Sequence, residues 1–240
     1  MNIVCRNDYL LSTLPSLEPI GSIPPMSKSE LLVQVVDSKG PVRSVEMILL
    51  SDDLIQYEAF LSEETEQDKI DLAVLSLENS ENKTVLPDFL LPEEENQEKE
   101  NKRLSVDELW SRYFRYAESI AKHNHSNFLK AWIGFEVGLR NALTAARSQI
   151  LELDPEAYLV TPELADADMN YTNIISSWSS ASTPLAALEV LDKARWEWLE
   201  EHGNWYSSSA DEIEVYAAKL ILLHQWRRIL SDNQQNNKKE

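Results

Sequence analysis

The stretch from Phe128 to Leu153 decides the fold, and it reads FLKAWIGFEVGLRNALTAARSQILEL. Its apolar residues recur every three or four positions, at Phe128, Trp132, Phe135, Leu139, Leu143, Ala146 and Ile150. That spacing places them on one side of an α-helix of roughly seven turns. We therefore expect a buried amphipathic helix at the centre of its domain, within an all-α, multi-helix fold.

A polar edge runs along this predicted helix. It consists of Glu136, Arg140, Asn141 and Arg147. Glu136 and Arg140 have the i to i+4 order that favours an ion pair within a helix. Polar groups beside so apolar a stripe need partners. The edge is interpreted either as an internal network that fixes helix order or as a surface for another protein of a complex.

A second candidate interface lies near residue 196. Trp196 and Trp198 follow Arg195, and two residues at i and i+2 cannot share one helix face. One tryptophan is therefore expected to be exposed, and exposed tryptophan beside arginine is typical of binding hot spots. The alternative is that Trp196 packs against the loop containing Trp205 and Tyr206.

The overall composition limits the classes of partner. The chain has 240 residues, 43% of them hydrophobic, and a formal net charge of −19. Such a charge argues against nucleic acid and anionic membranes, because phosphates would be repelled. The single cysteine, Cys5, allows no internal disulfide and agrees with a cytoplasmic location. No apolar run is long enough to predict direct membrane insertion.

The negative charge is concentrated before the central helix. Between Asp52 and Glu108 there are 18 acidic and 5 basic residues. This pattern predicts an N-terminal helical region at 1–77, an acidic linker or loop at 78–104, a C-terminal helical core at 105–232 and a disordered tail at 233–240. All seven tryptophans lie between Trp110 and Trp226, so the C-terminal region is expected to hold the stable core.

Local signals predict where the helices begin. Capping-box spacing occurs at Ser27 with Glu30, Ser105 with Glu108, and Ser209 with Glu212, while Ser126 or Asn127 and Thr183-Pro184 supply further caps. Residues 31–36 could form a helix or a minor strand, because their short apolar run has no decisive period. Further helices are expected at 42–49, 54–61, 72–77 (weaker) and 171–178. The last helix should bury more than one side, with Arg227 among its inward residues.

The chain offers no recognisable catalytic constellation. Its five glycines form no phosphate-binding or dinucleotide-binding motif. His123 and His125 would point apart on a helix and are interpreted as a polar helix end, not a metal site. His202 is expected at a helix C-terminus and His224 within the packing of the last helix. We therefore predict no catalytic residues, no cofactor, no metal and no enzymatic activity.

The chain contains the stretches Tyr9–Pro15 (YLLSTLP), Trp132–Leu143 (WIGFEVGLRNAL) with Arg147, and Tyr216–Leu223 (YAAKLILL) with Arg227-Arg228. These three stretches resemble a bacterial family of unknown function associated with V-type ATPase operons. That family is distantly similar to the C subunit of the rotary ATPase, which is called the d subunit in eukaryotes. The resemblance is spread over most of the chain.

The resemblance implies a non-catalytic, all-helical scaffold with a funnel- or bundle-like form. The C subunit is a socket in the central stalk that couples the membrane rotor ring to the shaft. The implied partners are therefore the rotor ring and the central-stalk subunits of a V-type ATPase, and the implied location is the cytoplasmic side of the inner membrane, reached through those partners. The alternative is an assembly factor or adaptor protein of the ATPase or of another complex, which binds transiently.

Overall fold

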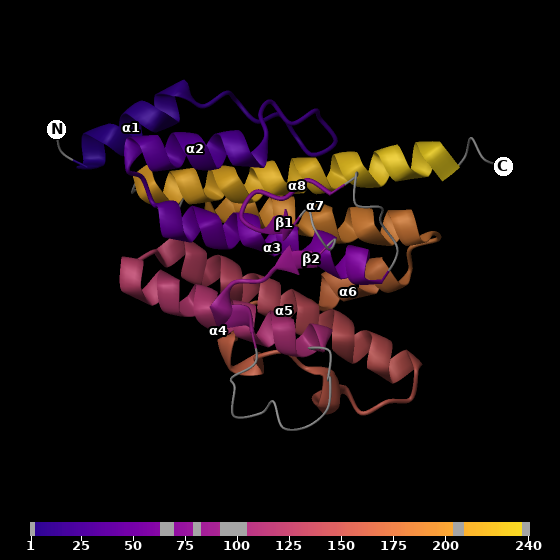
Figure 1. The fold of residues 1–240 in the computed structure, drawn as a ribbon. Coiled ribbons are helices and arrows are strands. Elements are labelled where there is room, and N and C mark those ends of the chain that lie inside the picture. The colour runs from indigo at the N-terminus through magenta and orange to yellow at the C-terminus, as the bar shows by residue number, and fades with distance from the viewer. Residues whose placement is uncertain (1–2, 63–69, 79–82, 92–104, 204–208, 237–240) are drawn as a thin grey trace. The chain divides into compact units, whose positions relative to one another are not determined.

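The protein is all-α in its described part (Figure 1). The computed structural model describes residues 3–62, 70–78, 83–91, 105–203 and 209–236. The α-helices are α1 (Ile3–Thr13), α2 (Lys28–Ser38), α3 (Val42–Leu61), α4 (Val106–Asn124), α5 (Asn127–Ile150), α6 (Thr172–Ser179), α7 (Pro184–His202) and α8 (Ser209–Asn236). The predicted fold class is confirmed.

The chain forms two compact units. Unit 1 contains Met1–Val74 and Ala181–Glu240, and unit 2 contains Leu75–Ser180. These units do not coincide with the regions expected from the sequence, because the expected core at 105–232 is divided between them. The division follows from helix pairing, since α8 packs with the N-terminal helices and α7 packs with α8.

Helix α8 is the centre of unit 1. It packs against α1, α2, α3 and α7. Its buried apolar residues include Ile213, Ala217, Leu220, Ile221 and Leu223. These positions surround much of the helix, which confirms that it is buried on more than one side. The inward arginine is Arg228, whereas Arg227 is exposed, so the expectation for Arg227 was wrong.

Unit 2 is built on the pair α4 and α5. Helix α5 packs against α4, α6 and two 3-10 turns, η4 (Pro155–Tyr158) and η5 (Pro162–Leu164). A third turn, η2 (Asp88–Leu90), packs on α4, where the rings of Phe89 and Tyr116 stack 3.7 Å apart. Strands β1 (Ser76–Glu78) and β2 (Lys83–Val85) pair antiparallel, with Ser76 opposite Val85.

The predicted helix starts agree with the observed caps. The side chain of Ser27 accepts a hydrogen bond from the Glu30 amide, and the Glu30 carboxylate accepts one from the Ser27 amide, which completes the capping box. The side chains of Ser105, Ser126 and Thr183 likewise accept hydrogen bonds from the first turns of α4, α5 and α7. The start of α8 adjoins residues 204–208, which lie outside the described residues.

Several local predictions were wrong. Residues 42–61 form one continuous helix, because the polar run Ser51–Asp53 between its apolar halves is accommodated inside unit 1. Residues 72–75 are not helical, and 76–78 form β1. The run at 31–36 is helical, so the strand element lies in the hairpin instead. Helix α8 continues to Asn236, past the predicted start of a disordered tail. The acidic run at 92–104 lies outside the described residues.

Helix α5 is more deeply buried at its start than the predicted stripe requires. Besides the stripe, Ile133, Gly134, Val137 and Gly138 are buried, because α4 covers one side and the chain from η4 to α6 covers another. At the other end Ile150 is 70% exposed, so its prediction as a buried residue was wrong. No helix in the described ranges is long and apolar enough to cross a membrane.

Two glycines lie where the chain after η4 approaches α5 closely. The Asp166 amide donates to the Gly134 carbonyl at 3.0 Å, and the Tyr171 hydroxyl donates to the Phe135 carbonyl at 3.1 Å. A Cβ at Gly138 would overlap the Tyr171 hydroxyl, whereas one at Gly134 would meet its nearest atoms at 3.5 Å. Of these two glycines, Gly138 alone is therefore required by the packing.

We expect Gly138→Ala to destabilise the protein by about 1–3 kcal/mol, because Tyr171 must move and lose its hydrogen bond. The matched variant Gly134→Ala should be neutral or stabilise by up to about 1 kcal/mol, since alanine favours the helix and has room. Urea unfolding of both variants measures the difference. Equal effects of the two substitutions would contradict this account of the helix contact.

Candidate functional site

The predicted site residues lie in both units. Glu136, Arg140, Asn141 and Arg147 belong to α5 in unit 2, and Arg195, Trp196 and Trp198 belong to α7 in unit 1. Each group is therefore described within its own unit.

The two arginines of the polar edge lie over aromatic rings. The Arg140 guanidinium is 4.7 Å from the Trp110 ring centre and 3.9 Å from a carboxylate oxygen of Asp107 on α4. The Arg147 guanidinium is 5.4 Å from the ring centre of Trp178 on α6. Cation–π contacts of this kind contribute about 0.5–1 kcal/mol at exposed sites. Arg147 is exposed, so one face of its side chain remains open to solvent.

Asn141 has an internal role. Its side-chain amide donates to the Val160 carbonyl and accepts from the Val160 backbone amide, both at 2.9 Å. This buried two-point contact fastens the chain after η4 to α5.

Burial raises the pKa of the Tyr171 hydroxyl, and the negative charges of Asp166 and Glu136 raise it further. Of the two interpretations of the polar edge, the internal network fits Asn141. The ion pair between Glu136 and Arg140 stays a prediction.

The residues on α7 divide between burial and exposure. Trp198 is buried and stacks on His202, with ring centres 4.2 Å apart, while Trp196 is partly exposed. The Lys219 ammonium of α8 lies 5.3 Å from the Trp196 ring centre. Arg195 pairs with the buried Asp192 at 3.3 Å. The alternative packing of Trp196 on Trp205 and Tyr206 concerns residues outside the described ranges.

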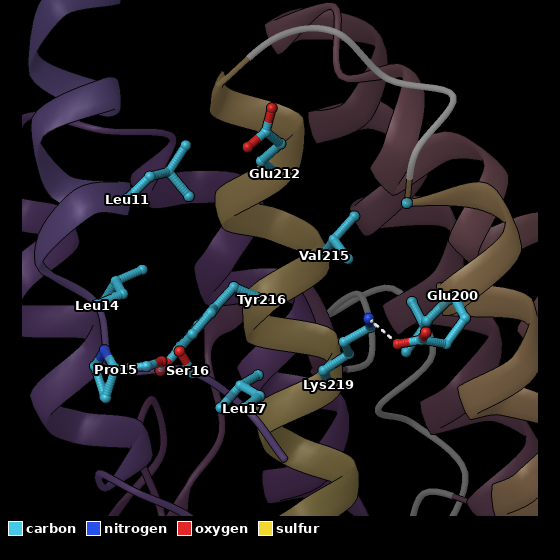
Figure 2. A pocket seen from close by; sticks show the side chains of 12 residues that line it. Leu11, Leu14, Pro15, Ser16, Leu17, Glu200, Glu212, Val215, Tyr216 and Lys219 are labelled. Atoms are coloured by element: carbon cyan, nitrogen blue, oxygen red, sulfur yellow. Dashed lines mark hydrogen bonds and ion pairs between the residues drawn. The ribbon is translucent and has the colours of Figure 1, made fainter. Parts of the chain in front are cut away.

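A groove lies between the chain after α1 and the α7–α8 hairpin of unit 1 (Figure 2). Its volume is about 420 Å³. The lining residues are Leu11, Leu14, Pro15, Ser16, Leu17, Leu199, Glu200, Gly203, Glu212, Val215, Tyr216 and Lys219. Apolar and polar residues both line it, polar atoms form the larger part of its exposed surface, and the charged residues are Glu200, Glu212 and Lys219. We define these residues as the α1–α8 groove.

Polar contacts hold the two walls of the α1–α8 groove together. The Tyr216 hydroxyl donates to the Pro15 carbonyl at 2.9 Å, and burial raises the pKa of Tyr216 to about 12. The hydroxyl therefore keeps its proton and remains a donor at neutral pH. Lys219 pairs with Glu200 across the α7–α8 hairpin. Glu212, which also lines the groove, is exposed to solvent.

The most polar part of the unit 1 interior was not predicted from the sequence. Lys28 is fully buried, and its ammonium lies 2.6 Å from Asp52 and 3.1 Å from Asp53. Arg228 of α8 binds both carboxylate oxygens of Asp52. Two cations from α2 and α8 therefore meet two carboxylates from α3. We call Lys28, Asp52, Asp53 and Arg228 the buried ion cluster.

The buried ion cluster also fastens the chain that leads out of α3. The Lys28 ammonium and the Gln56 side chain donate to the Asp71 carbonyl, and the Gln56 side-chain carbonyl accepts from the Asp71 amide. The Asp53 carboxylate accepts hydrogen bonds from the amides of Ala73 and Val74. Residues 71–74 form no regular secondary structure, but side chains of α2 and α3 bind several of their backbone polar groups. The sequence contains one indication of this cluster, because the adjacent Asp52 and Asp53 interrupt an otherwise apolar helical pattern.

The histidines have structural surroundings. His125 ends α4 with a φ of 53°, and His202 lies in the last turn of α7, as expected. His224 hydrogen-bonds the Met26 carbonyl at 2.9 Å, so its Nε2 carries the proton. Among the described residues, no group of three or more histidine, cysteine or acidic side chains could hold a metal ion.

Residues 56–173 match the family described as "Protein of unknown function (DUF2764)". The match covers just under half of the chain, including α4, α5 and the stretch Trp132–Leu143. The other two stretches, Tyr9–Pro15 and Tyr216–Leu223, lie outside it. No curated protein and no solved structure matches the chain. The family description assigns no activity and does not mention ATPases, so the ATPase connection stays a prediction.

We expect Lys28→Met to destabilise the protein by about 3–5 kcal/mol, because it leaves buried carboxylates short of a cation. The matched control is Lys193→Met, since Lys193 and its partner Glu197 are both exposed and 3.7 Å apart. That control should change the free energy of unfolding by at most about 1 kcal/mol. Chemical denaturation at pH 7 measures both. A loss below about 1 kcal/mol for Lys28→Met would contradict the assigned role.

The buried ion cluster and His224 also predict sensitivity to acid. Burial alone would raise the pKa of Asp52, but the charges and hydrogen bonds of Arg228 and Lys28 outweigh it and hold that pKa below its ordinary value. Burial lowers the pKa of His224, against the opposing effect of its bond to Met26. At a pH just below the ordinary pKa of each group, the folded state therefore binds fewer protons than the unfolded state. Lowering the pH through this range favours unfolding.

The free energy of unfolding should therefore be highest above about pH 6.5 and fall as the pH is lowered, first through His224 and then, below about pH 4, through Asp52. His224→Gln keeps a donor for Met26 and should flatten only the part of the curve immediately below about pH 6.5. Urea unfolding from neutral to acid pH tests this. Identical slopes in both proteins over that interval would refute the contribution of His224.

Proposed function

We propose that the protein is a non-catalytic coupling component of a V-type ATPase, similar to the C subunit of the rotary enzyme, which links the rotor ring to the central-stalk shaft. The observation that carries the proposal is the make-up of the α1–α8 groove. Two of the three stretches that carry the resemblance, Tyr9–Pro15 and Tyr216–Leu223, contribute to its walls. Stretches separated by about two hundred residues thus meet at one surface feature.

The character of the groove supports a protein partner. Leu11, Leu14 and Leu17 present apolar surface, and Glu212 and Glu200 contribute carboxylates at the edge. Leucine side chains flanked by polar and charged groups occur at the edges of protein–protein interfaces, which are polar. A helical segment of a partner protein could bury its apolar side against these leucines. The net charge of −19 favours a basic segment.

The third stretch supports a scaffold role for unit 2. Trp132–Leu143 lies in α5, where Gly138 leaves room for Tyr171 and Asn141 binds the backbone of Val160. The stretch therefore shapes a rigid helix pair, while Arg147 keeps an exposed guanidinium beside Trp178. Exposed arginine over tryptophan is suited to bind a partner carboxylate. Association with the membrane would come through the rotor ring.

Co-purification tests the proposal. The chain, expressed with the rotor-ring and shaft proteins, should be recovered with both in a fixed ratio. Leu14→Ser, which alters a half-buried groove residue, should reduce recovery by about tenfold, the equivalent of about 1.4 kcal/mol. Leu188→Ser is the matched control, because Leu188 is 42% exposed on α7 and does not line the groove.

The outcomes separate the possible roles. Recovery in a fixed ratio that depends on Leu14 supports a permanent component. Recovery only from incomplete complexes would indicate the assembly factor or adaptor instead. Failure to recover any ATPase protein when all are present would refute both roles in the ATPase. Arg147→Glu, measured in parallel, reports whether the exposed arginine of α5 also contacts a partner.

A further inference from the structure

The C-terminal end of α5 exposes an unusual amount of apolar surface. The exposed fractions are 70% for Ile150, 65% for Leu151, 46% for Leu153 and 43% for Tyr158. We call these four residues the α5 tip. They lie within nine consecutive positions, in the last turn of α5, the residues after it and the end of η4. Clustered apolar side chains of this size on a surface commonly mark an interaction site.

The backbone holds the α5 tip in a defined conformation. Glu152 has a φ of 56°, a left-handed conformation that residues other than glycine seldom adopt. The Leu153 amide donates to the Ser148 carbonyl at 2.9 Å, and the Glu152 amide donates to the Gln149 carbonyl at 3.4 Å. These are the two hydrogen bonds of a Schellman motif. The exposed leucines are therefore presented from a capped helix end.

The following turn is fixed as well. The Asp154 side chain accepts a hydrogen bond from the Glu156 amide at 3.1 Å and so caps η4, which packs back on α5. A preorganised surface loses little conformational entropy when it binds.

The charges between the apolar residues define the partner. Glu152, Asp154 and Glu156 alternate with the α5 tip along the chain, and all three are exposed. A second copy of this chain would bring the same carboxylates against one another, and an anionic lipid surface would also be repelled. A segment with lysine or arginine beside an apolar stripe would satisfy both the leucines and the carboxylates.

We propose that the α5 tip is a docking surface for a basic amphipathic helix of another protein. The apolar stripe of that helix covers Leu151 and Leu153, and its flanking cations pair with Glu152 and Glu156. The apolar side chains supply the anchors, and the carboxylates form the polar rim. This inference concerns unit 2 and does not depend on the α1–α8 groove.

The test uses the full chain and a synthetic leucine–lysine peptide of about five helical turns, labelled for fluorescence anisotropy at about 0.15 M salt. The double variant Leu151→Ser/Leu153→Ser should bind the peptide at least about tenfold more weakly than the unaltered protein. Leu188→Ser is the matched control for loss of an exposed leucine and should bind normally. Circular dichroism and thermal unfolding confirm that each variant is folded.

Reversing the charges beside the α5 tip tests whether the partner is basic. Glu152→Lys/Glu156→Lys should weaken binding of the leucine–lysine peptide and strengthen binding of a leucine–glutamate peptide. Equal affinity of the unaltered protein and the double serine variant would overturn the proposal. A dimer of the chain that dissociates when Leu151 and Leu153 are replaced by serine would also overturn it, because the α5 tip would then bind a second copy of the chain. Leu14→Ser should leave peptide binding intact, which separates this result from the test of the groove.

Discussion

Polar side chains buried between apolar helices need partners, and this requirement governs how each unit packs. In unit 1, Asp52 lies in the polar run between the apolar halves of α3 and is satisfied by Lys28 from α2 and Arg228 from α8. In unit 2, Asn141 of α5 is satisfied by both backbone groups of Val160. A helix that shifted by one turn would leave a charge or an amide without a partner, so each contact selects one arrangement. Apolar packing alone discriminates less sharply between neighbouring registers.

The same acidic chain uses its charges in two ways. Inside unit 1, carboxylates are neutralised by lysine and arginine, and they fasten residues 71–74 beside α3. On the surface, carboxylates border apolar side chains at the α1–α8 groove and at the α5 tip. At the α5 tip the exposed carboxylates repel a second copy of the same surface and attract a basic segment. The groove also carries Lys219, so the two proposals rest on different arrangements of charge in different units.

Local signals in the sequence predicted local structure well. Ser27, Ser105, Ser126 and Thr183 begin helices because capping depends only on residues within one turn. The continuity of α3 was missed because a polar run inside a helix resembles a boundary unless its distant partners are known. The exposure of Ile150 was missed for a related reason. Helical spacing identifies the apolar side of a helix, but it does not say how far along that side the neighbouring elements extend.

The sequence by itself determined the all-α class, the beginnings of most helices, the amphipathic character of α5 and the strongly acidic surface, because these depend on composition and short-range spacing. Only the tertiary structure decided that Lys28 meets Asp52 and Arg228, that Gly138 must make room for Tyr171, and that segments from the two ends of the chain form a groove. These contacts join residues far apart along the chain. Such pairings leave no periodic trace in a single sequence, since they depend on which helix faces come together when the core is buried.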